Sequence, residues 1–208
     1  MILINNRIID HSQPCFVIAE AGVNHNGDLT LARKLIDVAI EAKADAVKFQ
    51  TFKAERLVCV SAKKANYQLE TTNPQESQLD MLRKLELTKQ QHIELIAYCK
   101  EKNILFLSTP FDEESADLLH ELNVPLFKIP SGEITNIPFL KHIAKKGKPM
   151  IVSTGMSCLA EVEKAIEAIE GEDNKAICLL HCVSNYPAKA EDVNLKAIST
   201  LLAAFSYP

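Results

Sequence analysis

The most restrictive feature of this chain is a repeated pattern in which short apolar runs are followed directly by polar side chains. The six runs are residues 16–19, 46–47, 104–107, 126–127, 150–152 and 177–180, and helical patterns separate them. Alternating strands and helices predict an α/β protein with a parallel sheet. Parallel strands in a β/α barrel carry their chemistry at their carboxyl ends. The six polar clusters are therefore expected to line one active-site rim.

Helix-capping residues follow the strands and support this pattern. Asp28 precedes apolar residues at helical spacing, and Thr88 with Gln91 reads as a capping box. Asp112, Asn136 and Ser157 are expected to begin three further helices. The last helical pattern runs from Leu195 to Phe205. Its apolar positions are Leu195, Ile198, Leu201, Leu202 and Phe205.

The expected fold is a TIM (β/α)8-type barrel with about six of its eight βα units present. An open, doubly wound sheet is the alternative. Residues 5–14 are expected to form a small hairpin before the first strand. Residues 52–87 form a long insertion with a short helix near Leu79, Leu82 and Leu85. An insertion at this position predicts either a substrate loop or a surface that packs against another subunit.

Composition sets the class of protein. The chain has 208 residues, 47% of them hydrophobic and 24% charged, which is typical of a globular domain. Its net charge of -4 and scattered lysines argue against a nucleic-acid partner. No apolar run reaches the roughly 20 residues that cross a bilayer. The six cysteines have no CxxC pairing, which indicates a reduced, cytoplasmic protein without a cysteine metal site.

Glu20 follows the first apolar run. A carboxylate at the end of a buried strand is costly unless it is paired or takes part in chemistry. Burial is expected to raise its pKa, as suits a general acid or base. An ion pair with Lys48 on the neighbouring strand is the other interpretation, and the two are compatible.

Two lysines occupy equivalent positions, Lys48 and Lys128, and each follows or ends an apolar run. Lysine is rarely buried without a partner. Together with nearby hydroxyls and glycine-adjacent backbone at Gly132 and Gly155, they predict a site for a phosphate or a carboxylate. The hydroxyls expected on the same rim are Ser108, Thr109, Ser131 and Ser153.

Other rim residues have less specific signals. Glu133 is a second carboxylate, so that two carboxylates can share acid and base roles. Gln50 and Tyr186 can orient a sugar or an amide through hydrogen bonds. His25 is ambiguous, and His181 is interpreted as a histidine whose hydrogen bonds are satisfied within the protein. No histidine spacing here indicates a metal site.

Taken together, the strand-end motifs resemble the sialic acid synthase family. The resemblance covers residues 15–200, in the family's order and spacing. The motifs that carry it are IAEAGVNHNG at 18–27, VKFQT at 47–51, STPF at 108–111, KIPSGE at 128–133, STGM at 153–156 and HCVSNYP at 181–187.

This resemblance implies a TIM barrel that joins phosphoenolpyruvate to an N-acylated amino sugar and releases phosphate. It implies two catalytic carboxylates, Glu20 and Glu133, and two sugar ligands, Gln50 and Tyr186. Ser184 stands where some relatives carry an asparagine phosphate ligand. The implied phosphoenolpyruvate ligands are Lys48, Thr109, Lys128, Ser131, Ser153 and Ser184.

The resemblance also implies parts that these 208 residues do not supply. Members of the family bind Mn²⁺ or Mg²⁺ through two histidines on the seventh and eighth strands, which lie beyond Pro208. An antifreeze-like domain follows the barrel in a domain-swapped homodimer. Residues 1–208 are therefore expected to be part of a catalytic barrel, with weak or no activity alone.

Two other functions remain open. One is a different barrel synthase or aldolase that uses phosphoenolpyruvate. The other is a non-catalytic fragment that assembles with another chain through its exposed sheet edges. Within the family, the acceptor is N-acetylmannosamine, its 6-phosphate or a bacterial diacetamido sugar. No extra cationic cluster is evident for a phosphorylated acceptor, which favours an unphosphorylated one.

Overall fold

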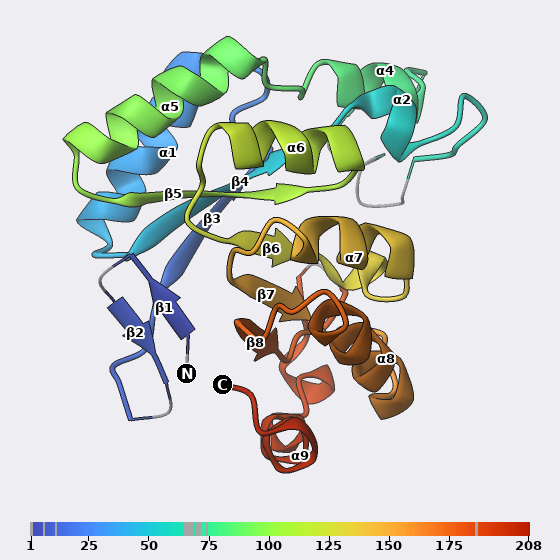
Figure 1. Cartoon of the computed structure of the whole chain (residues 1–208). Coiled ribbons are helices and arrows are strands. Elements are labelled where there is room, and N and C mark those ends of the chain that lie inside the picture. The colour runs from blue at the N-terminus through green and yellow to red at the C-terminus, as the bar shows by residue number, and fades with distance from the viewer. Residues whose placement is uncertain are drawn as a thin grey trace. The chain divides into compact units, whose positions relative to one another are not determined.

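The computed structural model describes residues 2–5, 7–10, 12–64, 69, 72–73, 75–185 and 187–208 (Figure 1). The chain divides into two compact units. The first unit is Val17–Leu122, and the second combines Met1–Phe16 with Asn123–Pro208. Each unit contains its own parallel sheet.

The first unit is a three-stranded parallel sheet covered by helices. Its strands are β3 (Ile18–Gly22), β4 (Ala46–Thr51) and β5 (Leu105–Pro110), in that spatial order. The helices α1 (Leu29–Glu41) and α5 (Lys89–Glu101) pack against each other and against these strands. Helix α6 (Glu113–Glu121) follows β5 and contacts it. Sequential order is what consecutive right-handed βα units produce.

The second unit repeats this arrangement. Its strands β6 (Phe127–Ile129), β7 (Met150–Ser153) and β8 (Ile177–Leu180) are parallel and sequential. Helices α7 (Ile137–Ala144) and α8 (Leu159–Glu170) pack together. The short helices η1 (Ser131–Glu133) and η2 (Ala190–Asp192) and the helix α9 (Lys196–Phe205) complete the unit. The hairpin β1 (Ile2–Ile4) and β2 (Arg7–Ile9) lies earlier in the chain than the expected 5–14.

The structure confirms the α/β class and all six predicted parallel strands. Four predicted N-caps are also confirmed, because the side chains of Asp28, Thr88, Asp112 and Asn136 accept backbone N–H groups at their helix starts. The prediction for α8 was wrong by one residue, since Cys158 rather than Ser157 is its N-cap. These starts are predictable because a cap is a contact between residues two or three positions apart.

Strand β4 presents different chemistry on its two faces. Side chains alternate along a strand, so Lys48 and Gln50 lie on one face and Phe49 and Thr51 on the other. The Phe49 ring stacks on Phe106 of β5 with centroids 5.5 Å apart. Both rings are buried, so this second face is the one that packs in the core.

The insertion 52–87 has a small apolar core of its own. It contains the short helices α2 (Ala54–Leu57) and α4 (Gln78–Arg83), which confirms the predicted helix near Leu79. Phe52 packs with the buried residues of both helices. The members of this cluster are Phe52, Ala54, Leu79, Met81 and Leu82.

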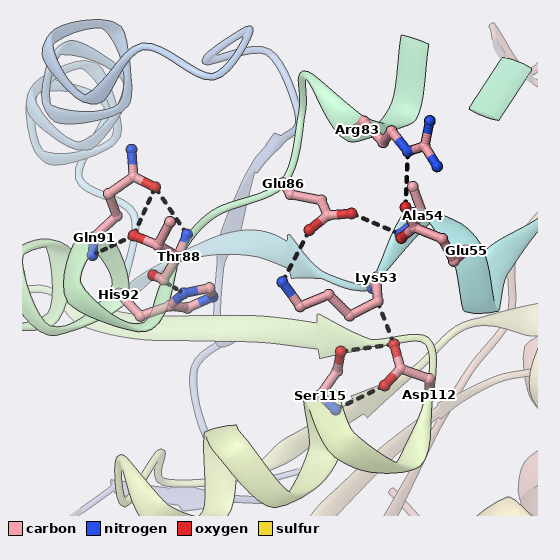
Figure 2. Close-up of polar contacts among 10 residues, drawn as sticks. All are labelled: Lys53, Ala54, Glu55, Arg83, Glu86, Thr88, Gln91, His92, Asp112 and Ser115. Carbon is pink, nitrogen blue, oxygen red and sulfur yellow. Dashed lines mark hydrogen bonds and ion pairs between the residues drawn. The ribbon is translucent and has the colours of Figure 1, made fainter. Parts of the chain in front are cut away.

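Glu86 fastens the two ends of the insertion together (Figure 2). Its carboxylate accepts the Ala54 N–H at 2.8 Å and pairs with the Lys53 ammonium at 2.9 Å. The Lys53 N–H in turn donates to Asp112, which caps α6. The contacts of Glu86 therefore hold the first and last residues of the insertion together.

The loop after β3 packs against the end of α4 at Gly27. This glycine has a φ of +78°, and a Cβ built on it would overlap the carbonyl oxygen of Lys84. Both observations require glycine, because L-residues are strained at this φ and the neighbouring group is backbone.

We expect Gly27→Ala to destabilise the protein by about 1–3 kcal/mol more than Gly147→Ala, because it adds a backbone clash to the same strain. Gly147 is a matched control, since its φ is +67° and nothing lies within 4 Å of a built Cβ. Urea unfolding of both variants measures the difference. Equal losses of stability would show that the close approach to Lys84 is not needed.

Candidate active site

Lys48 is the centre of a polar cluster formed by side chains of β3, β4 and β5. Its ammonium lies 2.5 Å from the Glu20 carboxylate and donates to the Thr109 hydroxyl at 3.1 Å. Glu20 and Lys48 are direct partners in the β3–β4 register. Lys48 is only 9% exposed, so its charge is compensated by groups from both neighbouring strands. The predicted ion pair is confirmed.

The expectation that Glu20 is buried was wrong. Its side chain is 49% exposed, whereas that of Lys48 is 11% exposed. Glu20 is the middle residue of β3 and lies beside an irregularity in the strand register between Glu20 and Gly22. The carboxylate is therefore accessible to solvent and can exchange protons with a small molecule.

Gln50 lies on the same face of β4 as Lys48 and is partly exposed. A Cβ added to Gly22 would lie 3.3 Å from Glu20 Oε1 and 3.7 Å from Gln50 Nε2. Gly22 also has a φ of +53°. Glycine at this position therefore leaves space beside two polar groups that face each other across β3 and β4.

Ser108 does not belong to this cluster, which corrects the sequence prediction. It is fully buried and its hydroxyl lies 2.7 Å from that of Thr51. Thr51 contacts His92 Nε2 of α5 at 2.8 Å. The alternation of side chains explains the error, because Ser108 and Thr109 are adjacent and must point to opposite faces.

The buried chain Ser108–Thr51–His92 has one consistent set of hydrogen positions. His92 Nδ1 lies 2.9 Å from the Thr88 carbonyl, which can only accept, so Nδ1 carries the proton. Burial lowers the pKa of His92, and the neutral ring accepts the Thr51 hydroxyl at Nε2. Thr51 then accepts from Ser108. These bonds fix the outer face of β4 and β5 to α5.

His25 is also buried and neutral. Its Nδ1 accepts the Gly27 N–H at 3.0 Å, while Nε2 has no partner in the part of the chain that the structure describes. Burial, and secondarily His92, lowers the pKa of His25. Its ring packs beside Phe49 at 6.0 Å. His25 therefore supports the loop after β3 from within the core.

Lys128 is the centre of a second cluster, in the other unit. Its ammonium donates to Ser153 Oγ at 2.6 Å and to the Ile129 carbonyl at 2.8 Å. Lys128 is 9% exposed, the same fraction as Lys48. The prediction that both lysines are buried and have partners is confirmed within each unit.

Ser131 joins the ends of the three strands of the second unit. Its hydroxyl accepts the Gly155 N–H at 3.1 Å and lies 3.2 Å from Cys182 Sγ. A Cβ on Gly155 would overlap Ser184 Oγ and lie 2.8 Å from Ser131 Oγ. Gly155 was expected to leave room for a ligand, but protein hydroxyls occupy that space. A Cβ built on Gly132 would have no atom within 4 Å.

The remaining candidates have the following surroundings. Glu133 accepts the side-chain amide of Asn136 at 2.8 Å. Thr154 donates its hydroxyl to the Leu180 carbonyl, which ties β7 to β8. His181 donates Nε2–H to the Val193 carbonyl at 2.5 Å, so its interpretation as an internally bonded histidine is confirmed, although it is partly exposed. Tyr186 lies outside the described residues.

A metal ion does not fit the residues that are described. Within those ranges, no three side chains of His, Cys, Asp or Glu come together in a group that could hold one. A search of the same residues for membrane spans found no helix of sufficient length and apolar character.

Two features of the site were not predicted from the sequence. One is the contact of the Cys182 sulfur with the Ser131 hydroxyl, which follows β6. His92 lies in a helix with only ordinary amphipathic spacing. The one available signal was the position of Cys182 inside the last polar cluster.

Buried lysines, hydroxyls and an accessible carboxylate lie together on parallel strands of an α/β protein, and ligand sites of such folds lie at the carboxyl ends of the strands. The model of the NeuB family matches residues 35–208. The chain belongs to the NeuB family. The sequence resemblance to sialic acid synthases is thereby confirmed.

Named relatives give the same result. The chain is 57% identical over 191 residues to the N,N'-diacetyllegionaminic acid synthase of Campylobacter jejuni, in a match that covers 91% of this chain and 57% of that protein. It is 50% identical over 201 residues to the synthase of the same name from Legionella pneumophila, covering 95% and 56%.

A solved structure shows the same fold. N-acetylneuraminic acid (sialic acid) synthetase from Leptospira borgpetersenii, in complex with citrate, matches with a TM-score of 0.81 and 36% identity. The match covers 94% of this chain and 64% of that one. The chain thus spans just over half the length of the curated relatives named above.

The two buried histidines predict how stability depends on pH. Their folded pKa values lie below the ordinary 6.5, so the unfolded chain binds more protons near and below that pH. The free energy of unfolding is therefore expected to fall as the pH drops from 7 to 5.5, by up to about 1.4 kcal/mol per pH unit for each histidine.

Urea unfolding across that range measures this slope. We expect a smaller slope for His92→Gln. This variant also loses buried hydrogen bonds, which lowers its stability at every pH, so the dependence on pH rather than the stability itself is compared. His120→Gln, which changes a histidine on the exposed surface of α6, controls for the loss of a histidine as such. An unchanged slope in His92→Gln would contradict the assignment of His92 as a neutral buried ring.

Proposed function

We propose that this chain carries the phosphoenolpyruvate site of a nonulosonic acid synthase, which condenses phosphoenolpyruvate with an N-acylated amino sugar. The observation that carries the proposal is the pair of lysines Lys48 and Lys128. Each lies within a strand, Lys48 in β4 and Lys128 in β6, each is 9% exposed, and each donates to a hydroxyl on or directly beside the next strand. Fixed ammonium and hydroxyl donors are the groups that bind phosphate and carboxylate.

Each cluster is proposed, within its own unit, to bind an anionic group. Phosphoenolpyruvate carries two groups of that kind, a phosphate and a carboxylate. Family resemblance supports the same assignment for the hydroxyls. The proposed ligands are Lys48, Thr109, Lys128, Ser131, Ser153 and Ser184.

The reaction forms one carbon–carbon bond and breaks one carbon–oxygen bond. C3 of phosphoenolpyruvate attacks the aldehyde carbon of the open-chain sugar, and the aldehyde oxygen takes up a proton to become a hydroxyl. Water adds to the resulting oxocarbenium at C2 and loses a proton. The C2–O bond to the phosphate then breaks as the C2 hydroxyl becomes the keto oxygen and its proton passes to the leaving phosphate, which leaves the keto acid and inorganic phosphate.

Two carboxylates are proposed to move these protons. Glu20 is accessible and stands 2.5 Å from Lys48, so it is placed to accept the proton of the attacking water beside a cation that binds the substrate. Glu133 is assigned to the sugar aldehyde by resemblance. Its carboxylate is held in place by Asn136.

The acceptor is proposed to be a bacterial diacetamido sugar. The similarity to N,N'-diacetyllegionaminic acid synthases supports this choice over N-acetylmannosamine and its 6-phosphate. Gln50 and Tyr186 are the proposed sugar ligands. An amide side chain such as Gln50 can both donate to and accept from an acetamido group.

The remaining family features are proposals of the same kind. They are a TIM barrel to which these six βα units belong, a cytoplasmic location, and a homodimer with an antifreeze-like domain. The resemblance also implies Mn²⁺ or Mg²⁺. By the same resemblance, its ligands are proposed to be two histidines beyond Pro208.

Lys128→Ala is expected to weaken phosphoenolpyruvate binding by about 10-fold or more, because a charged hydrogen bond to the anion is lost. Titration calorimetry with the purified chain measures the dissociation constant. Lys145→Ala is the matched control, because Lys145 is 65% exposed and its ion pair with Glu172 is long at 3.8 Å. Unchanged affinity in Lys128→Ala would remove this residue from the anion site.

A chimera tests the reaction. Residues 1–208 are joined to the C-terminal remainder of the Campylobacter jejuni relative, and phosphate release is measured with different acceptors. We expect release with N-acylated amino sugars, greatest with a diacetamido sugar, and none with simple aldose phosphates. The Lys128→Ala chimera is the control for background hydrolysis.

Other outcomes favour the alternatives. Release with aldose phosphates alone would indicate a different phosphoenolpyruvate-dependent synthase. A folded chimera that releases no phosphate, combined with stable association of residues 1–208 with another chain, would favour the assembly function. A monomer of residues 1–208 on size-exclusion chromatography would argue against that function.

A further inference from the structure

Cys182 makes a contact that the proposed function does not use. It follows β8, and its sulfur lies 3.2 Å from Ser131 Oγ, which follows β6. The N–H of Gly155, which follows β7, donates to the same oxygen at 3.1 Å. One hydroxyl therefore joins the ends of three strands, and we call Ser131, Gly155 and Cys182 the Ser131 cluster.

The number of donors and acceptors limits what Ser131 can do. A hydroxyl has one O–H donor and two acceptor lone pairs. The N–H of Gly155 donates to one lone pair of Ser131 Oγ. If Ser131 donates its O–H to sulfur, it has no donor left for a ligand. If the Cys182 thiol donates instead, both lone pairs are filled and the O–H must point elsewhere.

We propose that Cys182 is a positioning residue that directs the Ser131 O–H to an anionic oxygen of the substrate by donating its own S–H to Ser131 Oγ. This inference rests on the proposed function, in which Ser131 binds phosphoenolpyruvate. No bond to Cys182 is formed or broken, and only the direction of two hydrogen bonds is specified.

The energetics favour this direction once an anion is present. Sulfur is a weak acceptor, so Ser131 loses little when its O–H turns away from Cys182. A hydrogen bond from O–H to a charged oxygen is about twice as strong as one between neutral groups. A serine at 182 could also donate, whereas an alanine could not.

The surroundings of Cys182 differ from those of the buried cysteines. Burial raises the pKa of Cys99 to about 12 and that of Cys178 to about 11, and both thiols pack in the interior. Cys182 is only partly buried and its sulfur meets a hydroxyl. Gly155 is fixed beside it, because any side chain there would collide with Ser131 and Ser184.

A double-mutant cycle tests the proposal by calorimetric titration of phosphoenolpyruvate into the purified chain. We expect Cys182→Ala to raise the dissociation constant about 3- to 10-fold and Cys182→Ser to change it less than about 2-fold. In the Ser131→Ala background, Cys182→Ala should have no further effect, because its contribution passes through Ser131.

Cys158→Ala is the control, since Cys158 is exposed at the start of α8. The inference is overturned if Cys182→Ala binds like the unaltered chain, or if its effect is the same with and without Ser131. The proposed function fails separately if the unaltered chain binds no phosphoenolpyruvate, or if Ser131→Ala does not weaken binding.

A second measurement needs no variant and so does not depend on folding of a mutant. Iodoacetamide is reacted with the unaltered chain, and the alkylation of each cysteine is followed by peptide mass spectrometry. We expect phosphoenolpyruvate to slow alkylation of Cys182 several-fold and to leave Cys158 unaffected. Equal rates at Cys182 with and without phosphoenolpyruvate would overturn the inference.

Discussion

A buried ammonium group must keep hydrogen-bonding partners, and this requirement organises both halves of the molecule. Lys48 meets it with Glu20 on one side and Thr109 on the other, so one charge links three neighbouring strands. Lys128 meets it with Ser153 and a backbone carbonyl. An uncompensated charge at either position would cost several kcal/mol. The partners are thus needed for folding as well as for binding.

The two faces of β4 have different roles, one in the proposed site and one in packing. On β4, Lys48 and Gln50 carry the site, whereas Phe49 and Thr51 pack towards the helices. The Ser108–Thr51–His92 chain then fixes β4 and β5 to α5 from behind. Because Thr51 adjoins Gln50 and Ser108 adjoins Thr109, a rigid buried face holds the neighbouring site residues in position. This is the usual requirement for a preorganised site.

Two loops that follow strands are held in place by close backbone packing at glycines rather than by ion pairs. Gly27 lets the loop after β3 approach Lys84, and Gly155 lets Ser131 and Ser184 approach the loop after β7. In the second case the contact also includes Cys182, which the proposed positioning role uses. The insertion 52–87 is held at its base by Glu86, so its ends cannot move independently of β4.

The sequence by itself determined the α/β class, the six parallel strands, four helix caps and the two partnered lysines. These follow from periodicity, from caps that span two or three residues, and from the cost of burying a charge. Only the tertiary structure decided which hydroxyls meet which partners. Ser108 and Thr51 are 57 positions apart, and Ser131 and Cys182 are 51 apart. Such pairs depend on the register between strands and on the packing of helices against them, which local patterns do not specify, although alternation along a strand does separate neighbours such as Ser108 and Thr109.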